Sequence, residues 1–211
     1  MRSTITTLLL YGLSWPVLRD SIDRLLFVWQ SHDALPLVDQ RYAAHPIATT
    51  FHLLPGLIFF LIAPLQFHPG LRRKTPQLHR LAGRTFIATG ITSSLGVMYM
   101  VLVFPALGGL LTQIVTWAIC LGMIAAMLLA LNSAKRRRFA RHQRLMRLAF
   151  ALGLTVSTAR LYIFAADALF SIPFEQSFTI ASALGLATNL AALALIDPSP
   201  FLRPRPPTVT R

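Results

Sequence analysis

The chain has 211 residues, of which 55% are hydrophobic and 13% are charged, and its formal net charge is +13. So many apolar and so few charged residues exclude an ordinary soluble domain and indicate an integral membrane protein. The positive charge does not indicate nucleic acid, because the basic clusters flank apolar segments and contain few aromatic residues. Contact with anionic lipid headgroups accounts for them better, so we expect the lipid bilayer, and no nucleic acid, as a partner.

Residues 1–30 are predicted to form an apolar N-terminal helix. Residues 5–18 are apolar but short for a membrane span, and the charged residues Arg19, Asp20, Asp23 and Arg24 follow at once. No small-residue cleavage site follows the apolar run, so we expect the segment to be retained. Two interpretations stay open, a sixth span with an ionic patch facing the bundle or a helix in the membrane interface. The spanning interpretation is slightly favoured.

Five further segments are apolar and about 20 residues long, which is the length that crosses a bilayer as a helix. They are residues 46–67, 85–104, 110–131, 148–170 and 178–196. Pro105, Gly108 and Gly109 interrupt one long apolar stretch and predict the turn of a helical hairpin. The fold class is therefore an all-α polytopic transmembrane helical bundle over residues 45–197. The proline-rich, charged residues 198–211 are predicted to be a disordered cytoplasmic tail.

Lys and Arg residues predict the orientation of the bundle. They gather between the first and second spans, between the third and fourth, and after the fifth, while the intervening connections contain none. Basic residues beside short loops are retained in the cytoplasm. We therefore expect a multi-pass protein of the cell inner membrane with its basic loops and C-terminus in the cytoplasm.

Polar residues inside the spans are the candidates for function, because burying them in lipid is costly. On the first span, His52 and Gln66 share one helical face, and on the fourth span, His142 and Arg160 do the same. Because these two spans run in opposite directions, His52 and Arg160 are expected at one depth. Gln66, His79 and His142 are expected to gather near the other end of the bundle.

Several segments resemble a known family. They are HLLPGLIFFLIAPLQF, LHRLAGRTFIATG and RHQRLMRLAFALGLTVSTARLYI, followed by Asn189 in the fifth span. Over residues 45–196 the chain resembles the bacterial predicted membrane protein family called domain of unknown function 2306. The resemblance implies the membrane fold and no established activity.

One predicted function is a redox or electron-transfer protein that holds haem b. His79 and His142 are predicted to face one another as axial ligands of the haem iron, with Gln66 nearby. Arg84 and Arg147 follow these histidines at a spacing of five residues, where they would pair with the haem propionates. The alternative is that both histidines are simply interfacial residues at the starts of helices.

The second predicted function is a binder or transporter of a small anionic or amphipathic molecule. Its contacts would be His52 and Arg160, together with Asn189, which the family resemblance singles out. Alternatively, Arg160 extends along its aliphatic stem to lipid headgroups or to Asp167. No phosphate loop, dinucleotide turn, zinc-binding helix or nucleophile elbow is present, so the sequence leaves open whether the protein is an enzyme.

Overall fold

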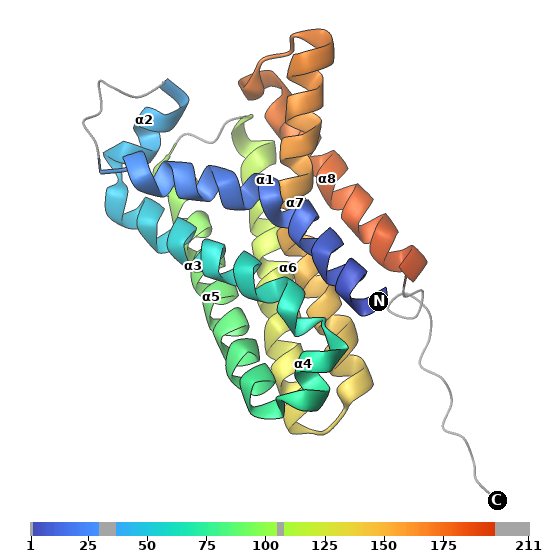
Figure 1. Ribbon diagram of the computed structural model, residues 1–211. Helices are drawn as coiled ribbons and strands as arrows, with labels where there is room; N and C mark the ends of the chain where they lie inside the picture. The colour runs from blue at the N-terminus through green and yellow to red at the C-terminus, as the bar shows by residue number, and fades with distance from the viewer. Residues whose placement is uncertain (1, 30–36, 105–107, 197–211) are drawn as a thin grey trace, which may run out of the picture.

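The computed structural model of the chain describes residues 2–29, 37–104 and 108–196, which fold into helices without any strand (Figure 1). The helices are α1 (Arg2–Phe27), α2 (Leu37–Ala44), α3 (Pro46–Gln66), α4 (Pro69–Lys74), α5 (Pro76–Val103), α6 (Gly109–Lys135), α7 (Phe139–Phe170) and α8 (Phe174–Ile196). The predicted turn is confirmed at Gly108 and Gly109, which both have positive φ angles of 79° and 66°. Pro105 and the predicted disordered tail, residues 198–211, lie outside the described residues.

Five of these helices, α3, α5, α6, α7 and α8, are long and apolar enough to cross a membrane. The prediction of an all-α bundle with five spans is therefore confirmed. α5 and α7 begin well before the apolar segments that predicted them, so His79 and His142 lie on helices and not in loops. A proline at the first position of α5 favours this early start, since its missing N–H is not needed there.

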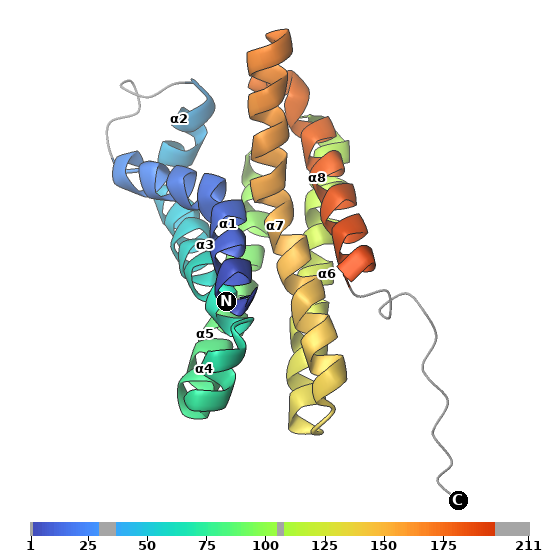
Figure 2. The ribbon, with the colours of Figure 1, turned by 45° about the vertical axis from the view of Figure 1, so that its right-hand side comes forward.

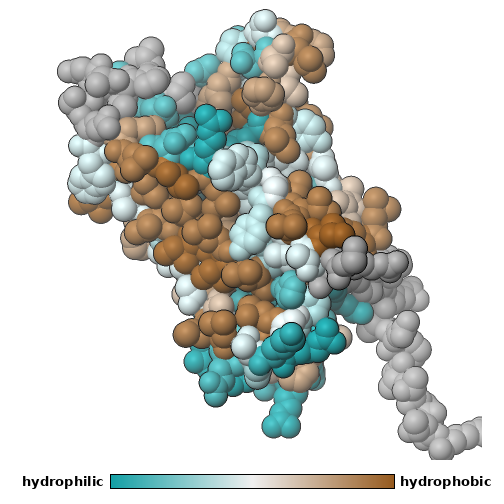
Figure 3. Space-filling model, in the orientation of Figure 1, coloured by the Kyte–Doolittle hydropathy of each residue, from teal (hydrophilic) through white to brown (hydrophobic). Residues whose placement is uncertain are grey.

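The bundle has two distinct ends. α4 and the connection between α6 and α7 lie together at the lower end in Figure 1, and α2 and the start of α8 lie at the opposite end. We call the lower end the basic end, after Arg72, Arg73 and Lys74 of α4 and the arginines that follow α6. Hydrophilic residues cover this end, while hydrophobic residues dominate the middle of the face shown (Figure 3). This distribution fits a lipid-facing belt above a polar end.

α1 is not among the five candidate spans, because it contains no window that is both long and apolar enough. It runs obliquely across α3 and α7 and packs against both (Figures 1 and 2). The hydroxyl of Tyr11 donates to the carbonyl of Leu61 on α3 at 2.8 Å, and Ser157 Oγ of α7 donates to the carbonyl of Leu13 at 2.6 Å. α1 therefore joins the two sides of the bundle.

The middle of the bundle is filled by phenylalanine rings. Phe59 of α3 stacks on Phe86 of α5 with ring centroids 4.4 Å apart. Its ring fits where two glycines leave space, since a Cβ atom at either Gly90 or Gly153 would lie 3.0 Å from it. Rings are in contact across α3, α5 and α7 at this level. We call this group the aromatic core: Phe59, Phe60, Phe86 and Phe150.

α3 and α5 approach each other closely at Gly96. A Cβ atom at this position would lie 2.9 Å from the Cα atom of His52. One turn away, Ser93 Oγ donates to the carbonyl of His52 at 2.9 Å. Small residues allow such close approach of helices, which is a main source of helix association in lipid. The crossing therefore fixes the backbone that carries His52.

Gly96→Leu should separate α3 from α5 and lower the free energy of unfolding by about 1–3 kcal/mol, the usual cost of overpacking. Thermal unfolding of the detergent-purified protein measures the effect. Gly12→Leu on α1 is the control, because no atom lies within 4 Å of a Cβ atom at Gly12. That variant should be at least as stable as wild type, since leucine favours the helix. Equal stability of the Gly96→Leu and wild-type proteins would contradict the close crossing.

Candidate functional site

We use the term polar stripes for the helical faces that carry His52 and Gln66 on α3 and His142 and Arg160 on α7. Two cavities lie at opposite ends of these stripes, with the aromatic core between them. The first, of about 250 Å³, is lined on α3 by His52, Gly56 and Phe59 and on α7 by Gly153 and Arg160. The second, of about 290 Å³, lies at the basic end and is lined by Gln66, His142 and Met146 of the same two helices. We call them the apolar cavity and the basic cavity.

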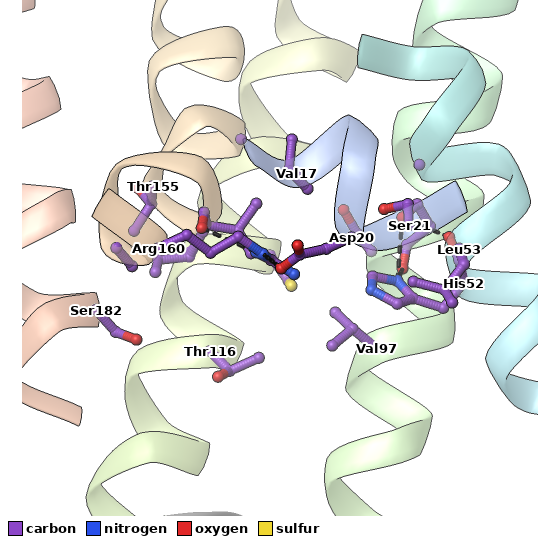
Figure 4. Close-up of a pocket in the computed structure, with 18 of the residues that line it drawn as sticks. Val17, Asp20, Ser21, His52, Leu53, Val97, Thr116, Thr155, Arg160 and Ser182 are labelled. Carbon is purple, nitrogen blue, oxygen red and sulfur yellow. Dashed lines mark hydrogen bonds and ion pairs between the residues drawn. The ribbon is translucent and has the colours of Figure 1, made fainter. Parts of the chain in front are cut away.

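The apolar cavity extends between α1, α3, α5, α6, α7 and α8, and most of its wall consists of apolar side chains. Arg160 extends from α7 toward Asp20 of α1, while His52 of α3 lies on the other side of the cavity (Figure 4). Thr116 and Ser182 line the part of the wall formed by α6 and α8 (Figure 4). The site is therefore an apolar space with its charged groups at one side.

Arg160 forms an ion pair with α1. Its Nε atom donates to Asp20 Oδ2 at 2.5 Å, and its Nη1 atom donates to the carbonyl of Val156 at 2.9 Å. The interpretation that Arg160 reaches Asp167 or lipid headgroups is wrong, because the guanidinium turns inward to Asp20. Asp167 is exposed on the last part of α7. The partly exposed carboxylate of Asp20 thus compensates the charge of Arg160.

Arg24, one helical turn after Asp20, also faces this cavity. Its Nε atom donates to Asp39 of α2 at 3.1 Å, and its guanidinium lies over the ring of Tyr42 at 4.8 Å from the centroid. Arg160 and Arg24 therefore each have a carboxylate partner. The net charge on this side of the apolar cavity is therefore close to zero, although two arginines line it.

The hydrogen bonds of His52 indicate its tautomer. Its Nδ1 atom lies 2.8 Å from the carbonyl oxygen of Ser93, which can only accept, so Nδ1 carries the proton. Ser93 Oγ in turn donates to the carbonyl of His52. Nε2 of this neutral tautomer keeps its lone pair, and the ring lies at the cavity wall (Figure 4). His52 therefore offers a hydrogen-bond acceptor to the cavity.

The basic cavity brings together most of the residues that were predicted to form the haem site. Gln66, His79, His142 and Arg147 all line it, and Arg72, Gln143, Phe67, Phe139 and Met146 complete the wall. Arg84 does not line it and is exposed on α5. Shared lining is a geometric finding only, and the haem b role of His79 and His142 stays a prediction.

Asn189 lines neither cavity and instead connects two helices. Its Nδ2 atom donates to the carbonyl of Ala151 on α7 at 3.2 Å, and its Oδ1 atom accepts from Thr158 Oγ1 at 3.0 Å. Both polar ends of the amide are therefore used in packing α8 against α7. This position supports a structural role and does not place Asn189 near a ligand in either cavity.

The sequence indicated an ionic patch on α1 but did not show which of its residues line a cavity. Asp20 and Arg24 line the apolar cavity, whereas the exposed pair Arg19 and Asp23 points away from it. The four-residue spacing of Asp20 and Arg24 is a signal for one helical face and was available. Ser93 had no such signal, since its role depends on which helix crosses α5.

Comparison with known proteins places the chain in a family. The family model described as "Predicted membrane protein (DUF2306)" matches residues 49–196. The chain belongs to this family. The match covers α3 to α8, which include all five candidate spans and both polar stripes. No curated protein and no solved structure gives a significant match. The family description names a class of protein and no activity.

Arg160→Leu should lower the free energy of unfolding by about 1–3 kcal/mol, because it leaves the Asp20 carboxylate without its charged partner. Arg160→Lys should restore only part of the loss, since lysine lacks the planar fork. Chemical denaturation in detergent measures both effects. Arg19→Leu is the control. It removes an ion pair in which Arg19 Nε lies 3.8 Å from Asp23 Oδ2 and the two side chains are 70% and 58% exposed. That change should cost less than about 1 kcal/mol. Equal losses from Arg160→Leu and Arg19→Leu would contradict the special role of the inner pair.

Proposed function

We propose that the protein binds an amphipathic small molecule in the apolar cavity, as a membrane binding protein or a transporter. The observation that carries the proposal is an apolar space inside the bundle that is lined by Arg160 on one side and by His52 on the other. Ligand sites are typically concave and mostly apolar, with a few polar groups that orient the ligand. The cavity volume of about 250 Å³ is near the lower limit for such sites, which favours a small ligand or one segment of a larger one.

The polar groups favour an uncharged ligand head over an anionic one. Asp20 compensates Arg160 and Asp39 compensates Arg24, so little net positive charge remains to attract an anion. His52 presents the lone pair of Nε2, which would accept a hydrogen bond from a hydroxyl or N–H group and repel a carboxylate. The ligand head we propose is therefore a neutral hydrogen-bond donor, bound with its apolar body toward the aromatic core.

Three probes with one ring system test this proposal: 2-naphthol, 2-methoxynaphthalene and 2-naphthoate. We expect the purified protein to bind 2-naphthol about 3–10-fold more tightly than 2-methoxynaphthalene, the value of one hydrogen bond. His52→Phe should remove that difference, because the ring stays but the acceptor is lost. Equilibrium dialysis, with the same detergent on both sides of the membrane, measures the binding.

A cavity-filling variant distinguishes binding of the probes in the cavity from their uptake by the detergent. Thr116→Trp on α6 should abolish binding of all three probes, since Thr116 lines the cavity. Leu121→Trp on the same helix is the matched control, because Leu121 is 52% exposed on the outside of the bundle. Identical binding by both tryptophan variants would contradict binding in the apolar cavity. Tighter binding of 2-naphthoate than of the two uncharged probes would contradict a neutral ligand head.

The distribution of charge supports an orientation for this site. We propose that the basic end faces the cytoplasm of the cell inner membrane, since basic residues beside short connections are retained there. The apolar cavity would then lie in the outer half of the bilayer, and its ligand would enter from that side.

A reporter fused after Arg211 should therefore read cytoplasmic, and one inserted at Phe174, at the start of α8, should read periplasmic. Paired alkaline phosphatase and fluorescent protein fusions give this result directly, because each is active on one side only. The opposite pattern at both positions would overturn the orientation, and with it the side from which the ligand enters.

A further inference from the structure

Among the described residues that line the basic cavity, six have side-chain nitrogen atoms and none has a carboxylate. Arg72 of α4, His79 of α5 and His142 of α7 contribute three of them, and Gln66, Gln143 and Arg147 complete the polar wall. The cavity lies at the basic end, where α3 ends and α5 and α7 begin. This lining differs from that of the apolar cavity, where the carboxylate of Asp20 lies beside the arginines.

Two buried nitrogen atoms at this cavity lack a hydrogen-bond partner within the described parts of the chain. They are Gln66 Nε2 and His79 Nδ1. Leaving a buried polar atom without a partner is costly, so each such atom calls for an explanation. Because the amide nitrogen of glutamine can only donate, the group that satisfies Gln66 must be an acceptor.

The orientation of His142 adds to this requirement. Its Nδ1 atom lies 3.0 Å from the carbonyl of Ala130 on α6, so Nδ1 carries a proton and Nε2 is left for a second partner. Together with the permanent charges of Arg72 and Arg147, the cavity then suits a group with several acceptor oxygens and negative charge.

We infer that the basic cavity binds a phosphate group, as inorganic phosphate or as the headgroup of an anionic phospholipid. Arginine binds phosphate through its planar fork, and the amide of Gln66 supplies a further donor. The volume of about 290 Å³ leaves room for the phosphate and part of its substituent. This site is independent of the ligand proposed for the apolar cavity, from which the aromatic core separates it.

Haem b is the other occupant that these residues suggest. A bis-histidine haem needs apolar walls on both faces of its ring, with the propionates alone at the charged edge. Here the apolar side chains are Phe67, Phe139 and Met146, and the remaining six lining residues are polar. The chemistry of the wall therefore favours an oxyanion over a porphyrin.

Isothermal titration of the detergent-purified full chain with inorganic phosphate tests the inference for a free anion. Native mass spectrometry with phosphatidylglycerol and phosphatidylcholine of matched chain length tests it for a lipid. We expect saturable binding of phosphate, preferential retention of phosphatidylglycerol, or both, and the two arms identify the source. Absence of both, or a Soret band in the purified protein that His79→Ala abolishes, would overturn the inference.

Arg72→Gln should weaken this binding at least about tenfold, the effect of a lost charged hydrogen bond. Arg73→Gln is the matched control, because Arg73 is exposed like Arg72 but does not line the cavity. It should change the affinity less than about twofold, since a charge that makes no direct contact with the bound group is screened by solvent. Gln66→Glu keeps the size of the side chain but adds a negative charge, and it should also abolish binding. Equal weakening by Arg72→Gln and Arg73→Gln would show general surface attraction and overturn the site.

Discussion

The position of Phe59 between α3, α5 and α7 determines the rest of the structure. Its ring fills the space that Gly90 and Gly153 leave open, and it stacks on Phe86. Because the ring occupies the middle of the facing stripes of α3 and α7, the polar residues at their two ends cannot form one continuous channel. They form two cavities with different chemistry, one enclosed by apolar walls and one surrounded by basic residues.

The N-terminal helix sets the chemistry of the apolar cavity. Without α1, Arg160 would be an uncompensated cation inside the bundle, which is costly in a bilayer. Asp20 provides the opposite charge and at the same time joins α1 to α7. The same contact that stabilises the bundle therefore removes the positive charge that an anionic ligand would require. This is why we propose a neutral ligand head, whereas the sequence alone suggested an anionic or amphipathic molecule.

The spans and polar stripes could be predicted because they follow from local rules, the length of an apolar run and the helical period. The same rules grouped His52 with Arg160 and His79 with His142, and each pair lines one cavity. The partner of Arg160 could not be predicted, since Asp20 lies 140 positions earlier and meets it only through the oblique path of α1. Local spacing also failed at Arg84, which is exposed although Arg147, at the same spacing from its histidine, lines the basic cavity.

Asn189 illustrates a second limit of sequence reasoning. A polar residue within a span indicates either a ligand contact or an interhelical hydrogen bond, and the two uses require the same side chain. Only the positions of Ala151 and Thr158 on the neighbouring helix show that the nitrogen and the oxygen of its amide both bond to α7. The ion pair of Arg160 and the amide of Asn189 thus both contribute to holding the bundle together, while His52 keeps a free acceptor.

The central claim is that the apolar cavity holds an amphipathic ligand whose neutral head donates to His52. A high-resolution structure of the protein, purified in its native lipids, tests this claim most directly. We expect elongated density in the cavity, with one end within hydrogen-bond distance of His52 Nε2 and the other against Phe59. A cavity closed by its own side chains, with Nε2 bonded to another residue of the chain, would contradict it.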